Sequence, residues 1–198
     1  MNLKNKGIIF ILSSPSGGGK SSISKQLLIT DKNLEPSISI TTRKPRLSEQ
    51  ENISYFFKNE QEFLHAIADD TLLEYAKIYD HYYGTPKQYV EDKLSKKIDL
   101  ILDIDWQGAK QIKEKMPNEV VTIFILPPNI EILKNRLIAR AEDHNDVIKH
   151  RIEEATREIS HAKYYDYVVL NDDLTSATLQ VRSIIDAERC KVYRSNIL

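Results

Sequence analysis

The feature that most constrains this chain is a glycine-rich loop that joins a short apolar segment to a helical pattern. Residues 7–12 are apolar in type, as in a buried strand, and residues 14–22 then carry three consecutive glycines followed by Lys20 and Ser21. Ile23 and Leu27 begin a helical pattern after them. Glycines allow consecutive backbone N–H groups to turn toward an anion, and the start of a helix adds its dipole. We therefore predict a loop that holds nucleotide phosphates, in an enzyme that moves a phosphoryl group.

Two side chains of this loop carry the chemistry. Lys20 is spaced to reach the β- and γ-phosphates of the nucleotide, and the Ser21 hydroxyl to hold Mg²⁺. The usual pattern has glycine where this chain has Ser14, so we expect a slightly reshaped loop. The loop residues predicted to bind the nucleotide are Ser14, Pro15, Ser16, Gly17, Gly18, Gly19, Lys20, Ser21 and Ser22.

Further apolar runs predict the other strands of a central parallel sheet, at residues 100–102, 120–126 and 167–170. Apolar residues at helical spacing between and after them predict helices near 130–137, 148–162 and 177–192. Strands that alternate with helices indicate an α/β fold with helices flanking the sheet. Residues from about 38 to 96 break the alternation, and we interpret them as an inserted subdomain.

Two carboxylates follow the predicted strand at 100–102. Asp103 and Asp105 are expected to point the same way, because side chains of a strand alternate between its faces. Ligands of open α/β sheets bind at the carboxyl ends of the strands. Paired carboxylates there suit hydrated Mg²⁺ or ribose hydroxyls, with Ser21 and Asp103 as the candidate metal ligands.

Composition narrows the class of protein. The chain has 198 residues, with Lys+Arg 28 against Asp+Glu 29 and a formal net charge of -1, which argues against a nucleic-acid-binding protein. The apolar run near the N-terminus is too short to span a membrane and lacks a cleavage-like site, so we expect a cytoplasmic protein without a membrane partner. The single Cys190 rules out an internal disulfide. The composition is compatible with a homo-oligomer.

A basic loop around Pro45 offers a second phosphate site. Arg43 and Arg46 flank the proline, and arginine side chains bind phosphate in a bidentate manner. Taken alone, the loop is better interpreted as a solvated basic turn.

Several separated segments resemble the signature motifs of guanylate kinases, in the same order along the chain. They are the loop at 15–21, residues 39–49, Tyr55, Glu74, residues 82–85, residues 102–108 and residues 168–173. The resemblance implies a P-loop kinase domain over about 7–186. Its core would take about 1–37, 97–133 and 163–198, its GMP-binding subdomain about 38–96 and its helical lid about 134–162. The implied reaction transfers the γ-phosphoryl group of ATP to GMP, and to dGMP, with Mg²⁺ as cofactor, in purine nucleotide metabolism and GMP recycling.

The same resemblance assigns the GMP site. A buried Glu74 would accept the guanine ring N–H and exocyclic amine. Adenine has no ring N–H donor on that edge, and such a site can reject the wrong base by roughly 10⁴-fold. Thr85 stands where serine is common in the family, and Ser48 and Asn52 stand where glycine is frequent, so we expect altered loop detail with binding retained. The residues implied to bind GMP are Ser39, Arg43, Arg46, Glu49, Tyr55, Glu74, Tyr83, Thr85, Asp103 and Asp105.

The lid and the donor base complete the implied machinery. Arg136 and Arg140 share one helical face, and with Arg151 they would fold over the phosphates and neutralise charge in the transition state, beside Lys20 and Arg43. Ala141 replaces a glycine that is usual in the family. Asn171 is similar to the residue that contacts the adenine of ATP. No general base is required, so alignment, charge neutralisation and exclusion of water would carry catalysis.

Three alternative functions compete with this assignment. Non-catalytic modules of the same fold bind protein partners but lack a working phosphate loop, which Lys20 and Ser21 argue against. A kinase for another small phosphorylated acceptor is disfavoured by Glu74 and Thr85, which match a guanine edge. A nucleic-acid-binding role has only the local basic loop in its favour.

Overall fold

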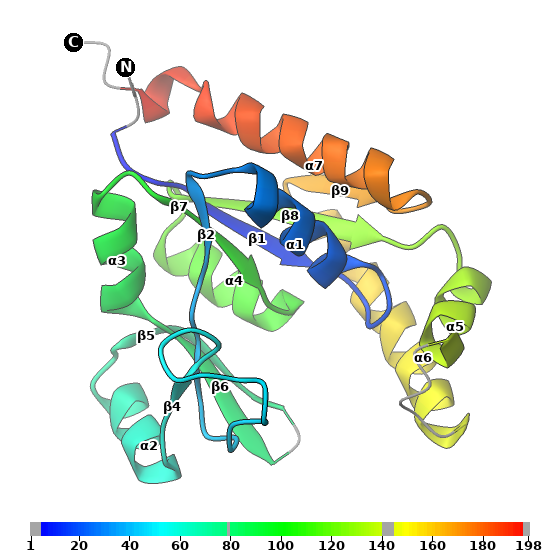
Figure 1. The fold of residues 1–198 in the computed structure, drawn as a ribbon, viewed down its shortest axis with the longest axis horizontal. Helices are drawn as coiled ribbons and strands as arrows, with labels where there is room; N and C mark the ends of the chain where they lie inside the picture. Colours follow the sequence, from blue (N-terminus) through cyan, green and yellow to red (C-terminus); the bar gives the residue numbers. More distant parts are fainter. Residues whose placement is uncertain (1–4, 79, 140–144, 196–198) are drawn as a thin grey trace.

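The chain folds around a five-stranded parallel sheet with helices on both faces (Figure 1). The structure is a computed structural model that describes residues 5–78, 80–139 and 145–195, without the side chains of residues 139–151. Neighbouring strands of this sheet pair in parallel. This confirms the α/β fold with a central parallel sheet that the sequence predicted. The strands are, in spatial order, β2 (Leu34–Pro36), β7 (Asp99–Asp103), β1 (Ile9–Ser13), β8 (Val120–Leu126) and β9 (Tyr167–Leu170).

Helices alternate with these strands along the chain. Among the described residues, no helix combines the length and the apolar character needed to cross a bilayer. The helices are α1 (Lys20–Thr30), α2 (Glu60–Ala68), α3 (Lys87–Ser95), α4 (Trp106–Lys115), α5 (Ile130–Ala139), α6 (Asn145–Ser160) and α7 (Leu174–Arg189), with short 3₁₀ turns η1 (Ala162–Tyr164) and η2 (Val192–Arg194).

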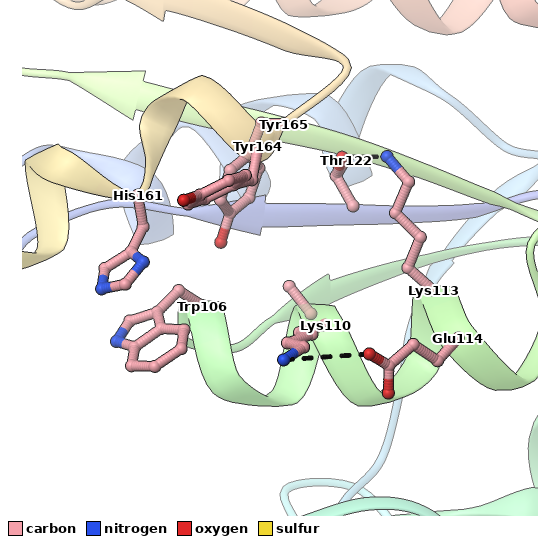
Figure 2. A pocket seen from close by; sticks show the side chains of 9 residues that line it. Trp106, Lys110, Lys113, Glu114, Thr122, His161, Tyr164 and Tyr165 are labelled. Atoms are coloured by element: carbon pink, nitrogen blue, oxygen red, sulfur yellow. Dashed lines mark hydrogen bonds and ion pairs between the residues drawn. The ribbon is translucent and has the colours of Figure 1, made fainter.

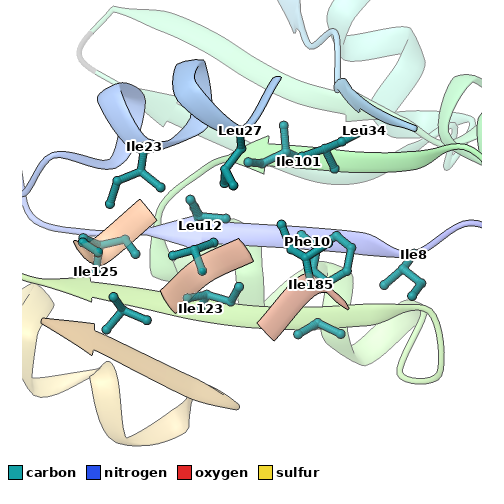
Figure 3. Packing of buried hydrophobic residues seen from close by; sticks show 14 residues of the cluster. Ile8, Phe10, Leu12, Ile23, Leu27, Leu34, Ile101, Ile123, Ile125 and Ile185 are labelled. Carbon is teal, nitrogen blue, oxygen red and sulfur yellow. The ribbon is translucent and has the colours of Figure 1, made fainter. Parts of the chain in front are cut away.

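The central strand β1 is buried on both faces, which explains its unbroken apolar sequence. On one face Phe10 and Leu12 belong to a core formed with α1 and α7, to which Ile185 contributes (Figure 3). On the other face Ile9 and Ile11 belong to a second core, formed with α3 and α4. Side chains alternate along a strand, so a strand covered on both faces needs apolar residues at every position.

The segment that interrupts the alternation forms a second, four-stranded sheet, which lies below the main sheet in Figure 1. Its hairpin of β5 and β6 places Glu74 opposite Thr85. The amide of Gln111 on α4 exchanges two hydrogen bonds with the backbone of Tyr75, each of 3.2 Å, and so joins β5 to the core. The strands are, in spatial order, β4 (Phe56–Phe57), β3 (Ile40–Thr41), β6 (His81–Pro86) and β5 (Leu72–Ile78).

Two local predictions are wrong. Strand β7 ends at Asp103, and Asp105 is the N-cap of α4, where its carboxylate accepts a 2.9 Å hydrogen bond from the Gly108 N–H. The two carboxylates therefore do not share a strand face; a capping residue leaves the strand to satisfy free N–H groups of the helix. Helix α7 ends at Arg189, and Val192 lies in η2 with 74% of its surface exposed. Helical spacing alone did not reveal where that helix stops.

A buried ion pair joins α7 to the first residue of β7 in the main sheet. Asp99 is fully buried and accepts hydrogen bonds from the Ile8 N–H at 2.8 Å and from Arg189 Nε at 2.7 Å. Arg189 also pairs with Asp31 at 2.7 Å. Removing Asp99 would leave the buried Ile8 N–H without its acceptor and would take one of two buried counter-ions from Arg189.

We therefore expect Asp99→Ala to lower the free energy of unfolding by about 3–5 kcal/mol in urea titrations. The matched control is Asp186→Ala, because Asp186 pairs with Arg182 and Arg189 at the exposed surface. That control should change stability by less than about 1 kcal/mol. Equal effects of the two substitutions would show that the buried pair has no special role.

Candidate active site

The loop between β1 and α1 surrounds a cavity of about 320 Å³. Gly17 and Gly19 have φ angles of 86° and 100°, in the left-handed region that favours glycine. This conformation turns backbone N–H groups inward, and α1 begins at Lys20, so its positive end faces the same space. The cavity therefore suits an anion. Its lining is Ser14, Pro15, Ser16, Gly17, Gly19, Lys20, Ser21, Asp103, Asp105 and Glu158.

The carboxylate of Asp103 connects the two reactive side chains of the loop. Lys20 Nζ lies 2.5 Å from Asp103 Oδ1, and the Ser21 hydroxyl donates to Asp103 Oδ2 at 3.0 Å. A hydroxyl and a carboxylate at the mouth of an anion cavity are oxygen ligands that Mg²⁺ accepts. Groups of three or more His, Cys, Asp or Glu side chains that could hold a metal ion do not occur among the described residues.

A buried carboxylate lies on the other side of the α4 N-terminus. Glu74 is 5% exposed, and its Oε1 accepts a 2.7 Å hydrogen bond from the hydroxyl of the buried Thr85. Burial, with a contribution from the nearby Asp105, raises the pKa of Glu74 to about 7. A Cβ atom on Gly108 would lie 2.9 Å from Glu74 Oε2, so glycine there leaves room for the carboxylate. This arrangement offers hydrogen-bond acceptors to a ligand with N–H donors.

The basic loop after β3 is ordered by an internal ion pair. Arg43 Nη2 lies 2.7 Å from Glu49 Oε1, and Glu49 Oε2 accepts the Arg46 backbone N–H at 2.8 Å. The Arg43 guanidinium stands 5.5 Å from the centre of the Tyr55 ring, which in turn packs edge-on against Tyr83. The hydrogen bond that Arg43 donates to Glu49 raises the pKa of Arg43, so that side chain stays cationic. Glu49 can only accept hydrogen bonds, so toward an anion its part is to orient Arg43.

The remaining predicted residues fall in several places. Ser39 precedes β3, and its carbonyl oxygen accepts the Phe56 N–H at 2.9 Å. Arg136 on α5 donates to the Asn171 carbonyl oxygen at 3.0 Å. Arg140 lies outside the described residues, as does the side chain of Arg151.

One residue of the loop cavity was missed by sequence reasoning. Glu158, near the end of α6, lines the cavity, and burial raises its pKa to about 7, against the opposing effect of Lys20. A signal was available, because Glu158 follows Arg151 by two helical turns and so shares its face. Its cavity position becomes visible only once α6 is placed against the loop.

A second cavity, of about 560 Å³, lies between α4 and η1 (Figure 2). Trp106 and His161 stack at one end of it, with ring centres 3.8 Å apart. Of its polar groups, Lys113 pairs with Asp166 at 2.6 Å, and Lys110 lies 3.9 Å from Glu114. The described lining of this cavity contains no glycine-rich loop that would turn backbone N–H groups toward an anion, so the loop cavity is the better candidate for the chemistry.

Comparisons with known proteins agree with this geometry. The family model described as guanylate kinase matches residues 6–188. A guanylate kinase of Rickettsia prowazekii (strain Madrid E) is 56% identical over 193 residues, which cover 98% of this chain and 98% of that protein. A guanylate kinase of Caldanaerobacter subterraneus subsp. tengcongensis is 46% identical over 198 residues, covering 100% of this chain and 96% of that one.

A solved structure resembles the whole chain as well. The crystal structure of guanylate kinase from Anaplasma phagocytophilum superposes with a TM-score of 0.78 at 36% sequence identity. The match covers 98% of this chain and 93% of that chain.

Proposed function

This chain belongs to the guanylate kinase family: it transfers the γ-phosphoryl group of ATP to GMP, giving ADP and GDP, and we propose how its residues do so. One observation carries the proposal. Asp105 connects the two halves of the site: it lines the loop cavity that contains Lys20, and it lies near enough to the buried Glu74 carboxylate to add to the rise in its pKa that burial causes. An acceptor base held at Glu74 would therefore point its phosphate toward the donor phosphates.

For GMP, we propose that residues of the second sheet recognise the guanine base and that the loop after β3 binds the phosphate. Glu74 would accept the guanine N–H groups, with Thr85 orienting the carboxylate and Ser39 along the base edge. Arg43, held by Glu49, would bind the phosphate because its guanidinium is charged and fixed in place. Arg46, Tyr55 and Tyr83 are the further proposed phosphate ligands.

For ATP, we propose that residues 14–22 hold the phosphates, with Lys20 beside the β- and γ-phosphates. The residues present fit Mg²⁺, since the Ser21 hydroxyl and the Asp103 carboxylate already meet at 3.0 Å. When bound there, Mg²⁺ would supply positive charge that stabilises the phosphate oxygens. Ser21 and Asp103 are the two protein ligands that we propose for it.

The chemistry then consists mainly of alignment. A phosphate oxygen of GMP is already a nucleophile, so no side chain has to remove a proton from it. Lys20 and Arg43 would hold the two reactants in line and neutralise charge as the γ-phosphoryl group moves. Arg136, Arg140 and Arg151 are proposed to add charge from the lid when it closes. The cytoplasmic location, a homo-oligomeric state and the subdomain boundaries stay predictions.

A panel of acceptors tests the base assignment. We expect GMP and dGMP to support ADP formation from ATP, and AMP, CMP and UMP to support it at least about 10³-fold less well in kcat/KM. The physical reason is that those bases do not present the two N–H donors that would satisfy the buried Glu74. The measurement is a coupled ADP assay at fixed ATP and Mg²⁺. Equal turnover of AMP and GMP would contradict the assignment of Glu74.

A further inference from the structure

We propose that Asn171 is a positioning residue that holds the phosphate loop in its anion-binding shape by donating a hydrogen bond to the Gly18 carbonyl oxygen. This inference rests on the proposed function, because it takes the loop as the site of the donor's phosphates. It goes beyond that function by directing the Asn171 side chain at the loop backbone, where the family resemblance would direct it at the adenine base.

The Asn171 amide is enclosed and bonded to the loop. The residue is 3% exposed, and its Nδ2 donates to the Gly18 carbonyl oxygen at 2.7 Å in a buried environment. Its backbone N–H donates to the Leu126 carbonyl oxygen at 2.8 Å, so the end of β9 is itself fixed to the sheet. A buried carbonyl that loses such a donor is left unsatisfied, which destabilises the conformation that buries it.

This hydrogen bond sets the direction of an N–H group in the loop. The peptide unit is planar and trans, so its C=O and N–H point to opposite sides. When the Asn171 amide holds the Gly18 oxygen on one side, the Gly19 N–H is directed to the other. Gly19 lines the loop cavity, and its φ of 100° belongs to the same local geometry. The hydrogen bond from Asn171 to Gly18 therefore orients the Gly19 N–H, a donor that is placed to bind phosphate.

The contact leaves no space for a side chain at Gly19. A Cβ there would fall 2.0 Å from Asn171 Nδ2, which is closer than any allowed non-bonded contact. Glycine at this position is thus required twice, by its positive φ and by the approach of the asparagine.

Asn171 is also held from the side of α5. Arg136 Nη2 donates to the Asn171 carbonyl oxygen at 3.0 Å. A Cβ on Gly17 would lie 3.1 Å from Leu133 and 3.3 Å from Leu137, so α5 itself packs against the loop. Asn171 therefore sits where the loop, the end of β9 and α5 meet, and we infer that its position is set by the fold before any nucleotide arrives.

The decisive probe is inorganic tripolyphosphate, which has phosphates but no base. It is tested with Mg²⁺ as an inhibitor competing with ATP, in the full-length enzyme and in Asn171→Ala. If Asn171 positions the phosphate loop, the substitution should raise the tripolyphosphate Ki and the ATP KM by a similar factor, about tenfold. The KM for GMP should be unchanged. Asn171→Leu keeps the branched shape without the donor and should behave in the same way, which covers the case in which alanine impairs folding.

The matched control is Asn33→Ala. Asn33 makes the same kind of bond, from its Nδ2 to the Lys97 carbonyl oxygen at 3.2 Å, at the opposite end of the sheet. Its removal should leave the tripolyphosphate Ki unchanged.

Two outcomes would overturn the inference. If the Asn171 variants raise the ATP KM and leave the tripolyphosphate Ki unchanged, Asn171 contacts the base of ATP and does not position the loop. If they change neither constant, it has no role toward the donor. Failure of tripolyphosphate to compete with ATP in the unmodified enzyme would instead overturn the assignment of the loop as the phosphate site.

Discussion

Lys20→Met is expected to lower kcat by at least about 10³-fold, because it removes the cation that we propose faces the transferred group while leaving the fold in place. The Lys20 ammonium lies at the floor of the loop cavity, 2.5 Å from Asp103 and 3.4 Å from the Ile104 carbonyl oxygen. Methionine has a similar length and flexibility and can occupy the same space. The substitution therefore removes only the positive charge that would stabilise the phosphates in the transition state.

The matched control for this prediction is Lys25→Met, on the same helix but exposed to solvent. It should leave kcat within about twofold, since an exposed lysine away from the cavity meets neither substrate. Circular dichroism melts of both variants test whether the fold is retained. A kcat for Lys20→Met close to that of the unmodified enzyme would remove the loop lysine from the mechanism.

The loop was predictable because its chemistry is local. Consecutive glycines, Lys20 and Ser21 lie within a few residues of one another, and the apolar run before them identifies the strand that leads into the loop. The main sheet was predictable for the same reason, since a strand buried on both faces is apolar at every position. Segments such as β2, which is three residues long, carry too little pattern to be recognised.

The other contributions depend on contacts between distant residues. Asn171 reaches Gly18 across the fold, and Gly108 matters only because the Glu74 carboxylate packs on it. Asp105 was expected to point from the strand, yet it reaches the cavity as a helix cap. Periodicity describes one element at a time, so it does not show which side chains two elements bring together. The family resemblance assigned Glu74 and Thr85 to one site, and the structure adds the 2.7 Å hydrogen bond between them.

Glu74→Gln is expected to lower kcat/KM for GMP by about 10³-fold, with little change in the KM for ATP. The glutamate offers two acceptor oxygens, whereas glutamine replaces one of them with an NH₂ donor that would face a guanine donor. The neighbouring Thr85 hydroxyl, 2.7 Å away, uses one lone pair and holds the group in its place. Initial rates measured at varied GMP concentration give kcat/KM for each variant. Glu91→Gln, on the exposed surface, is the control and should leave the ratio unchanged.

The raised pKa of Glu74 predicts how kcat/KM for GMP and the stability of the fold change with pH. With a pKa of about 7, set mainly by burial, the free enzyme loses the ionised acceptor as the pH falls, so kcat/KM for GMP should drop between about pH 8 and pH 6. Glu74→Gln should flatten that part of the profile.

A carboxyl whose folded pKa lies above its ordinary value of 4.5 destabilises the fold progressively as pH rises from about 4.5 to about 7, and by a constant amount above that. Glu74→Gln should therefore raise the melting temperature at pH 8 while it abolishes guanine selectivity.

A variant that loses GMP turnover and melts at a lower temperature would instead have a damaged fold. One that keeps GMP turnover would show that the buried carboxylate serves some purpose other than reading the base. Loss of GMP turnover together with a higher melting temperature is the combination expected of a charge buried for recognition, because only a ligand with two N–H donors compensates its desolvation.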